Sequence, residues 1–234
     1  MKVKLISYSQ VNIGAFTNDE FTDYPSTAQD IVAFCARVSN PANQFNTQTS
    51  ERLIQYLIKH KHWSPLEMVS VCLEIETTRD IARQMLRHRS FSFQEFSQRY
   101  ADPVKELNFV LREARLQDTT NRQNSIDIDY KNDQHRQIAY QWENLQKELL
   151  MRVKDTYEWA ISKGIAKEQA RSILPEGNTV SKLYVNGTLR SWIHYIELRS
   201  GNGTQKEHIE IAKACAEIIS KIFPMINTIK EEQR

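Results

Sequence analysis

The sequence predicts a globular fold that mixes α-helices with β-strands. Segments 3–8, 69–76 and 180–186 have the β-branched content or the apolar-polar alternation that is typical of strands. Between and after these segments, apolar residues recur at the three- and four-residue spacing of helices. With 234 residues, the chain is long enough for one large domain or two small ones and can bury a substantial core.

The composition excludes several classes of protein. The chain has 31 basic and 29 acidic residues, a net charge of +2, which argues against nucleic-acid binding through a global positive field. Its cysteines, Cys35, Cys72 and Cys215, lie far apart in apolar surroundings and lack zinc-ligand spacing, so we expect buried thiols and no metal. No signal peptide or membrane-spanning stretch is evident. We therefore expect a cytoplasmic protein.

The elements up to residue 67 follow from local signals. After the strand 3–8, Thr27 and Asp30 provide the cap of a helix that we expect to end near Ser39. A second amphipathic helix covers about 50–61 and ends in basic residues, which suit the negative pole of the helix dipole. Next, Ser64 is expected to cap a short turn that has proline at its first position.

The strand 69–76 leads directly into a helix. Thr77 or Thr78 is expected to cap this helix. Gln84, Arg87 and His88, at positions i, i+3 and i+4, would share one of its faces. The chain should then leave the helix in a loop. The buried stripe of the helix would comprise Ile81, Ala82, Met85 and Leu86.

The second half of the chain is expected to be mainly helical. Residues 101–134 are polar and are predicted to form an irregular surface excursion. A long helix with regularly spaced apolar residues should follow, to about residue 162, and a shorter one should cover about 167–174. After the strand 180–186, Thr188 caps a helix that contains Arg199, and a last helix covers about 204–223. The apolar residues of the long helix are Ile138, Trp142, Leu145, Leu149 and Val153.

The segment 87–100 has the side chains of an anion site. It contains three arginines, one histidine and four hydroxyl side chains, with three phenylalanines between them and one glutamate. Guanidinium groups match phosphate oxygens in pairs, and serine hydroxyls add short hydrogen bonds. On composition alone, two interpretations stay open: a local phosphate site, or an ordinary basic helix end followed by a loop.

Five segments in order resemble the flavin-dependent thymidylate synthases. The run Arg87-His88-Arg89, seven residues and then Ser97 is similar to the signature of that family. The other four segments are Arg37-Val38-Ser39; His62, Ser64 and Glu67 around Pro65; Ala170-Arg171 with Leu174-Pro175; and Arg190-Ser191-Trp192 with His194 and Leu198-Arg199. Together they extend over most of residues 30–220.

The resemblance implies an enzyme that methylates dUMP at C5. It implies 5,10-methylenetetrahydrofolate as the carbon donor, reduced FAD as the source of the hydride, NADPH as the reductant and dTMP as the product. It also implies one α/β (α+β) domain over 1–234, with a central mixed or largely antiparallel sheet flanked by long helices. The resemblance further implies a homotetramer with active sites shared between subunits. Its other partners would be the small molecules dUMP, folate and NADPH, and neither nucleic acid nor a membrane is expected.

The resemblance also assigns residues to two sets. The nucleotide set, expected to bind dUMP, comprises Gln84, Met85, Leu86, Arg87, Glu95, Phe96, Ser97, Gln98, Arg99, Arg171 and Arg199. The flavin set, expected to bind FAD tightly, comprises Ser39, His62, Ser64, Arg87, His88, Arg89, Glu95, Thr188, Arg190 and His194. His62 would flank the flavin or the folate. The chain departs from the family pattern at Thr188, where an asparagine is common, so either Thr188 or Asn186 would contact the flavin.

Arg199 is the residue that we expect to act in the chemistry. Activation of uracil builds negative charge on the ring carbonyls, which a fixed guanidinium stabilises. Ser97 is a poor candidate nucleophile because its basic neighbours are guanidiniums, which do not accept protons at neutral pH. None of the cysteines has the Pro-Cys-His context of the flavin-free thymidylate synthases.

Two other classes of function remain at this stage. In a single-stranded nucleic-acid-binding module, the loop after residue 87 would grip the backbone while its phenylalanines stack on bases. In a structural protein, the arginines would only form ion pairs. The near-zero net charge and the second arginine cluster at 171–199 favour an enclosed small-molecule site.

Overall fold

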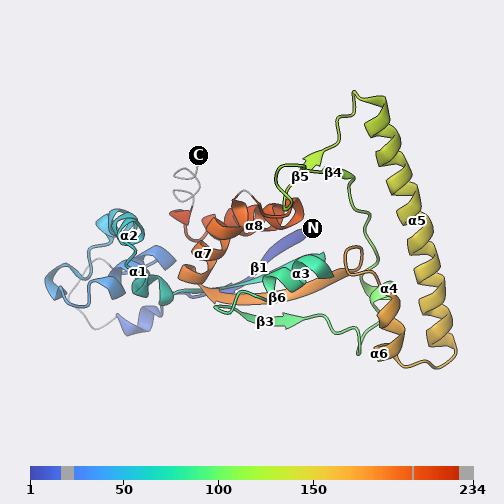
Figure 1. Cartoon of the computed structure of the whole chain (residues 1–234). Helices are drawn as coiled ribbons and strands as arrows, with labels where there is room; N and C mark the ends of the chain where they lie inside the picture. Colours follow the sequence, from blue (N-terminus) through green and yellow to red (C-terminus); the bar gives the residue numbers. More distant parts are fainter. Residues whose placement is uncertain (17–23, 202, 227–234) are drawn as a thin grey trace.

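The computed structural model describes residues 1–16, 24–201 and 203–226, and its centre is a four-stranded sheet (Figure 1). The strands β1 (Lys2–Tyr8), β2 (Ser70–Thr78), β6 (Val180–Thr188) and β3 (Ser92–Glu95) lie side by side in the order β1-β2-β6-β3. All neighbouring strands are antiparallel. This confirms the expected sheet with flanking helices. The strand β3 was not predicted, because it is short and forms only by pairing with β6.

The two central strands, β2 and β6, have opposite environments on their two faces. They pair over nine residues, from Ser70 opposite Thr188 to Thr78 opposite Val180. On β2, the apolar residues Val71, Leu73 and Ile75 are fully buried, whereas the residues between them are half-buried. The other face is polar and is crossed by ion pairs such as Lys4 with Glu74 at 3.3 Å. At the edge, β1 has a register shift between Leu5 and Ser7.

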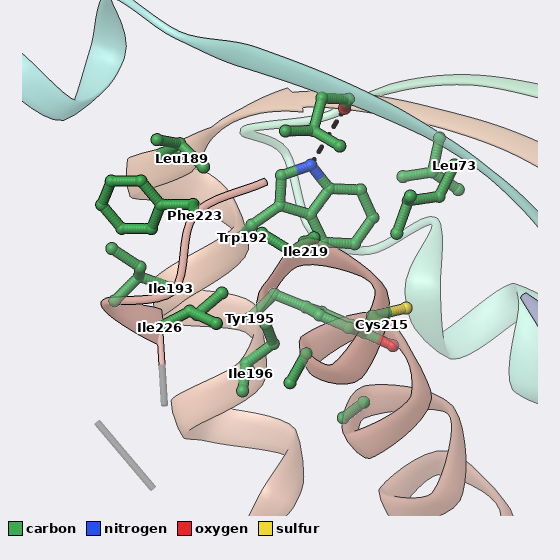
Figure 2. Packing of buried hydrophobic residues seen from close by; sticks show 14 of the residues in the cluster. Leu73, Leu189, Trp192, Ile193, Tyr195, Ile196, Cys215, Ile219, Phe223 and Ile226 are labelled. Atoms are coloured by element: carbon green, nitrogen blue, oxygen red, sulfur yellow. Dashed lines mark hydrogen bonds between the residues drawn. The ribbon is translucent and has the colours of Figure 1, made fainter. Parts of the chain in front are cut away.

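Three helices cover the apolar face: α3 (Arg79–Met85), α7 (Leu189–Ser200) and α8 (Lys206–Ser220) (Figure 1). Helix α8 lies within the expected range of 204–223. Figure 2 shows Trp192 and Tyr195 of α7 inside the packing, where the indole Nε1 donates to the carbonyl oxygen of Val71 at 3.0 Å. The buried residues of this main core include Leu73, Leu183, Leu189, Trp192, Ile193, Tyr195, Ile211, Cys215, Ile219 and Phe223.

The N-terminal helices α1 (Ala28–Ala36) and α2 (Ser50–Lys59) lie at one end of the molecule (Figure 1). The predicted capping box is confirmed: Thr27 accepts from the backbone of Asp30, and Asp30 accepts from that of Thr27. The helix ends at Ala36, before the predicted Ser39, because Arg37 turns away and donates to Thr49 Oγ1 at 2.8 Å. Four short 3-10 helices flank these elements, at Ile13–Ala15, Pro41–Asn43, Thr47–Thr49 and Ser64–Glu67.

Two of the predicted caps differ in detail. Ser64 makes no side-chain cap, since it is the first residue of its 3-10 helix and Trp63 holds the cap position. Thr78, rather than Thr77, precedes α3, but its hydroxyl binds the Asp80 carboxylate instead of the helix backbone. The expectation of three buried cysteines holds only for Cys215, because Cys35 and Cys72 are half-buried; all three are free thiols.

The prediction of an irregular excursion at 101–134 was wrong in part. It contains α4 (Pro103–Glu106) and a two-stranded sheet of β4 (Arg115–Gln117) and β5 (Ser125–Asp127). Long-range ion pairs hold it to the body: Arg112 binds Asp80, and Arg115 binds Glu207 at 2.7 Å. Such contacts join residues far apart in sequence, so no local pattern could reveal them.

The long helix α5 (Asp133–Ser162) stands at the opposite end of the molecule from α1 and α2 (Figure 1). The Asn132 side chain caps its first turn, and the helix ends at Ser162, as predicted. Its C-terminal half packs on α4, on α6 (Lys167–Ala170) and on the following 3-10 helix, Arg171–Ile173, around the buried Tyr157. Of the predicted apolar stripe only Val153 is half-buried. Ile138, Trp142, Leu145 and Leu149 are exposed.

Gly187 of β6 lies directly beneath the ring of Phe91. A Cβ at position 187 would lie 2.5 Å from Phe91 Cε1, nearer still to Cδ1, and 3.3 Å from Ser191 Cβ. We expect Gly187→Ala to displace this ring and to lower the free energy of unfolding by about 1–3 kcal/mol, measured by urea denaturation. Gly177→Ala is the matched control, because a Cβ there meets no atom within 4 Å. Equal stability of the two variants would contradict this close packing.

Candidate functional site

The anion-binding segment predicted at 87–100 lies in a loop followed by a strand. Helix α3 ends at Met85, so it carries Gln84 but not Arg87 or His88, contrary to the shared helical face that was predicted. The chain turns at 86–90, where Arg87 and Arg89 are exposed, and then enters β3. The ring of Phe91 anchors the turn, since it packs on Trp192 at a centroid distance of 4.6 Å.

Arg199 and His88 form a pair at the centre of the candidate site. Both are half-buried, and Arg199 Nε donates to His88 Nε2 at 3.0 Å. Burial, followed by the positive charge of Arg199, lowers the pKa of His88, so its ring remains a neutral acceptor. Within the described ranges, the Arg199 side chain has no carboxylate partner. A half-buried cation without a counter-ion is suited to a ligand with negative charge.

A hydrogen-bonded row of neutral side chains lies beside this pair. His208 of α8 is fully buried, and its Nδ1 lies 3.0 Å from Gln84 Oε1. Its Nε2 lies 3.0 Å from the Tyr195 hydroxyl, and Gln84 Nε2 donates to Gln205 Oε1 at 2.9 Å. Burial, Arg199 and His88 together lower the pKa of His208 to about 3.

The sequence prediction missed His208 and Tyr195 as parts of the site. A signal for His208 was present, because it lies three and seven residues before Ile211 and Cys215, on the buried face of α8. A histidine on such a face requires hydrogen-bond partners. Nothing local in the sequence could identify Gln84 as that partner.

Three members of the nucleotide set, Ser97, Arg99 and Arg171, lie near α6. Ser97, Arg99 and Lys167 line a hollow of about 540 Å³, together with Tyr100, Ala166 and Glu168. Arg99 is exposed and pairs with Glu168 at 3.2 Å. Arg171 is half-buried nearby. The Gln98 side chain is buried, and its Nε2 has no hydrogen-bond partner within the described chain.

Other members of the nucleotide set have partners within the sheet or the core. Glu95 accepts from Ser181 Oγ at 2.9 Å and pairs with the buried Arg79 at 3.5 Å. The side chain of Met85 lies in the core, and Leu86 packs against it. Phe96 is half-buried, and its backbone N–H donates to the carbonyl of Lys182. The Met85 side chain, which is 1% exposed, is therefore not available for contact with a ligand.

Several members of the flavin set, including Ser64, Arg190 and His194, lie in α7 and the 3-10 helix at Ser64–Glu67. Arg190 pairs with Glu67 at 2.6 Å, and the His194 ring meets Trp63 edge-on at a centroid distance of 4.5 Å. Burial, followed by the charge of Arg190, lowers the pKa of His194. The predicted cap of α7 is confirmed, because the Thr188 side chain accepts from the Ser191 backbone.

Three further members of the flavin set are accessible. Ser39, His62 and Ser64 are exposed, and the His62 ring lies 6.1 Å from that of Tyr56. Of the two candidates left open by the sequence, Thr188 is engaged in its cap, whereas Asn186 is exposed and has no side-chain partner within the parts of the chain described. Of these two side chains, that of Asn186 is therefore the more available for contact with a ligand.

Within the described residues, the members of the two sets lie at separate places along the sheet. Ser39, His62 and Ser64 follow α1 and α2 at one end, whereas Arg171 follows α6 at the other (Figure 1). The nine residues of β6 extend between these ends, roughly 30 Å at strand spacing. Arg199, His88 and Gln84 lie on the helical face of the sheet. The geometry thus places the members at the two ends in two half-sites, separate from the cluster of Arg199, His88 and Gln84.

The described residues show neither a membrane span nor a metal cluster. None of their helices is long and apolar enough to cross a membrane. They also contain no group of three or more His, Cys, Asp or Glu side chains placed to hold a metal ion.

Comparisons with known proteins agree on one family. The family model described as thymidylate synthase complementing protein matches residues 20–225. A probable flavin-dependent thymidylate synthase of Paramecium bursaria Chlorella virus 1 is 50% identical over 201 residues, which are 86% of this chain and 89% of that protein. The flavin-dependent thymidylate synthase of Synechocystis is 49% identical over 203 residues, with the same coverage.

A solved structure shares the fold. The UMP/dUMP methylase PolB of Streptomyces cacaoi, crystallised with 5-Br dUMP, is 22% identical to this chain. The match has a TM-score of 0.73 and covers 97% of this chain and 93% of that one.

The low pKa of His208 predicts acid sensitivity. Because its folded value of about 3 lies below 6.5, the unfolded chain binds this proton first as the pH falls. The free energy of unfolding should decrease between pH 6.5 and 3, by up to about 1.4 kcal/mol per pH unit from this group. Urea denaturation of His208→Gln at several pH values should give a shallower decrease. His60→Gln, at an exposed position, is the control and should retain the wild-type slope.

Proposed function

The chain belongs to the family of the flavin-dependent thymidylate synthases, and we propose that it methylates dUMP at C5 to form dTMP. The observation that carries the proposal is Arg199, a half-buried guanidinium that lacks a carboxylate partner in the described chain. His88 orients it, and Gln84 lies in the same cluster through His208. A fixed cation beside neutral hydrogen-bonding groups suits a uracil ring on which negative charge develops.

The proposal includes three further small molecules. In it, 5,10-methylenetetrahydrofolate supplies the carbon, NADPH supplies the reducing equivalents, and FAD is the bound cofactor. When bound, FAD would supply the hydride that converts the transferred methylene into a methyl group. The protein's part is then to bind, to orient and to stabilise charge.

The side chains of the flavin set fit FAD. Its pyrophosphate requires cations, and Arg89 is exposed without a partner in the described part of the chain, while Arg190 is held by one ion pair. Its flat ring system requires apolar and polar contacts, which Trp63 and His194 offer through their edge-on pair. Ser39, Ser64 and the Asn186 amide add hydrogen-bonding groups at accessible positions.

The nucleotide set fits a phosphorylated pyrimidine. The hollow beside Ser97 and Arg99 combines a hydroxyl, a guanidinium and the Lys167 ammonium, which are groups that bind a phosphate dianion. A phosphate would compete with Glu168 for Arg99, and exposed ion pairs of this kind are weak. Arg171 would complete the grip from the adjacent 3-10 helix.

In the proposed mechanism, Arg199 stabilises charge on a ring carbonyl. Its Nε is committed to His88, so the two terminal nitrogens of the guanidinium remain for the substrate. The rings of Phe91 and Tyr195, whose centroids are 5.8 Å apart, form an aromatic wall beside His88. Such a wall limits water, which strengthens the interaction between Arg199 and the developing negative charge.

No protein nucleophile is required. Burial raises the pKa of Cys35, Cys72 and Cys215, so the thiols remain protonated at neutral pH. Ser97 has no histidine or carboxylate hydrogen-bonded to its hydroxyl in the described chain to act as a base. Both observations support a reaction in which the cofactor, rather than a covalent enzyme adduct, drives the chemistry.

We also propose that the enzyme is a homotetramer with shared active sites. The separation of the two half-sites within one chain supports this, because a neighbouring subunit could supply the missing half. The exposed apolar side chains of α5 support it too, since Leu145 is 61% and Leu149 51% exposed. Apolar stripes of this kind are typical of surfaces that another chain covers.

The proposed function is tested on purified protein. We expect it to bind FAD, with a yellow colour and the flavin absorption bands. With methylenetetrahydrofolate present, dUMP should cause oxidation of the reduced flavin and the appearance of dTMP, detected by chromatography. Protein that remains colourless after reconstitution with FAD, or that forms no dTMP, would overturn the proposal.

Replacement of Arg199 should separate binding of the cofactor from turnover. We expect Arg199→Ala to retain the fold and most of the flavin but to lower kcat by about 100- to 1000-fold, because charge on the ring carbonyl loses its partner. Arg52→Ala, at an exposed position of α2, is the control and should behave as wild type. Normal turnover of Arg199→Ala would exclude the electrostatic role.

A charge on the α5 stripe should weaken assembly. We expect Leu145→Glu to shift the oligomer towards smaller species at micromolar concentration, measured by light scattering after gel filtration, because burial of an unpaired carboxylate is unfavourable. Gln137→Glu places the same charge at another exposed position of α5 and should leave the oligomer intact. An unchanged mass for Leu145→Glu would show that this stripe is not an interface.

A further inference from the structure

The side chains of Tyr195, His208, Gln84 and Gln205 form a row of hydrogen bonds, and in each of these bonds the donor can be identified. Its members come from α7, α8, α3 and the residue before α8, so tertiary packing alone brings them together. The spacings are 3.0 Å from the Tyr195 hydroxyl to His208 Nε2, 3.0 Å from His208 Nδ1 to Gln84 Oε1, and 2.9 Å from Gln84 Nε2 to Gln205 Oε1. Each link needs one donor and one acceptor.

The amide oxygen of Gln84 determines which imidazole nitrogen bears the hydrogen. An amide oxygen can only accept, so His208 Nδ1 must donate to it. The ring is neutral, because burial and the nearby Arg199 hold its pKa at about 3, and it therefore carries a single hydrogen. Nε2 must then accept, and the Tyr195 hydroxyl donates to it.

The reverse direction would leave a buried donor unpaired. If both amides turned over, His208 would donate through Nε2, and the Tyr195 hydroxyl would accept. Tyr195 is only 2% exposed, and within the described residues His208 is the one hydrogen-bond partner of its hydroxyl. The hydroxyl hydrogen would face apolar surroundings that include Cys215, near which Figure 2 shows the tyrosine oxygen. An unpaired buried donor is unfavourable, so Tyr195 selects the observed direction.

The selected direction leaves Gln84 with one free donor and one free acceptor. One amide N–H is used by Gln205 and one lone pair of Oε1 by His208, so the second of each remains. Uracil presents N3–H beside a carbonyl oxygen, and this amide can pair with both. Cytosine presents an unprotonated N3 beside an amino group, and pairing with it would require the amide to turn over.

We propose that Tyr195 and His208 are positioning residues that make the site specific for uracil over cytosine, by fixing the orientation of the Gln84 amide. The substrate class in this inference rests on the proposed function. Neither residue touches the nucleotide; both act through Gln84.

The test compares the binding of two nucleotides to the FAD-loaded enzyme. Dissociation constants for dUMP and dCMP are measured by calorimetry for the wild type and for Tyr195→Phe, which keeps the ring and removes only the hydroxyl. We expect the wild type to prefer dUMP and the variant to lose at least about tenfold of that preference, through weaker dUMP and stronger dCMP binding. A general loss of structure would weaken both.

Tyr157→Phe is the matched control. Tyr157 is also fully buried, its hydroxyl has no hydrogen-bond partner in the described chain, and it packs in the separate cluster between α5 and α6. We expect this variant to keep the wild-type ratio of dUMP to dCMP binding. A similar fall in both tyrosine variants would overturn the inference, because the effect would then be general.

The tautomer of His208 provides a second, independent measurement. In histidine-labelled protein, ¹⁵N chemical shifts distinguish a protonated from an unprotonated ring nitrogen, and His208→Gln identifies the signals. We expect hydrogen on Nδ1 in the wild type and a mixture of tautomers in Tyr195→Phe. Hydrogen on Nε2 in the wild type would overturn the inference.

The outcomes separate this inference from the proposed function. If the wild type prefers dUMP and Tyr195→Phe keeps the full preference, the inference fails while the function stands. If the wild type binds neither nucleotide, the proposed function fails and the inference fails with it.

Discussion

The pairing of β2 with β6 is the interaction on which the site depends. The two strands are antiparallel and fully in register over nine residues, and each continues without a loop into a helix. Thr78 ends β2 and Thr188 ends β6, so α3 and α7 leave from opposite ends of the pair and fold back over the same face. For this reason, the side chains of Gln84 and Arg199 lie in the same cluster.

The packing beneath the cluster keeps it neutral apart from Arg199. Trp192 and Tyr195 bury large ring surfaces on the sheet, and the indole N–H is satisfied by a backbone carbonyl. Charged imidazoles would be unfavourable there, so both His88 and His208 have lowered pKa values. Arg199 is thus a fixed cation surrounded by dipoles, an arrangement that would favour negative charge on a ring bound as proposed.

Local patterns predicted much of the fold. The capping box at Thr27 and Asp30 and the alternation along β2 depend on near neighbours, and both predictions agree with the structure. The short strand β3 and the ion pair of Arg115 with Glu207 depend on partners many residues away, so the sequence alone did not reveal them. The apolar stripe on α5 correctly predicted a helix, but periodicity does not reveal that the stripe faces outward.

The sequence predicted part of the candidate site, just as it predicted part of the fold. Motifs within 84–99 and 190–199 identified Arg199, His88 and Gln84, which the fold brings into one cluster. The roles in this cluster of His208 and Tyr195 follow only from the crossing of α7, α8 and α3, which no short motif encodes.

The edge strand β1 affects how chains can meet. An exposed strand edge offers unpaired backbone groups to any extended segment, and lysines and bulges are features that discourage such pairing. Lys2 and Lys4 point from this strand, and its register is broken between Leu5 and Ser7. Growth of the sheet from one molecule into the next is thereby disfavoured. In the assembly proposed above, contact between copies would then use side-chain surfaces, which can close into a finite assembly instead of an open-ended one.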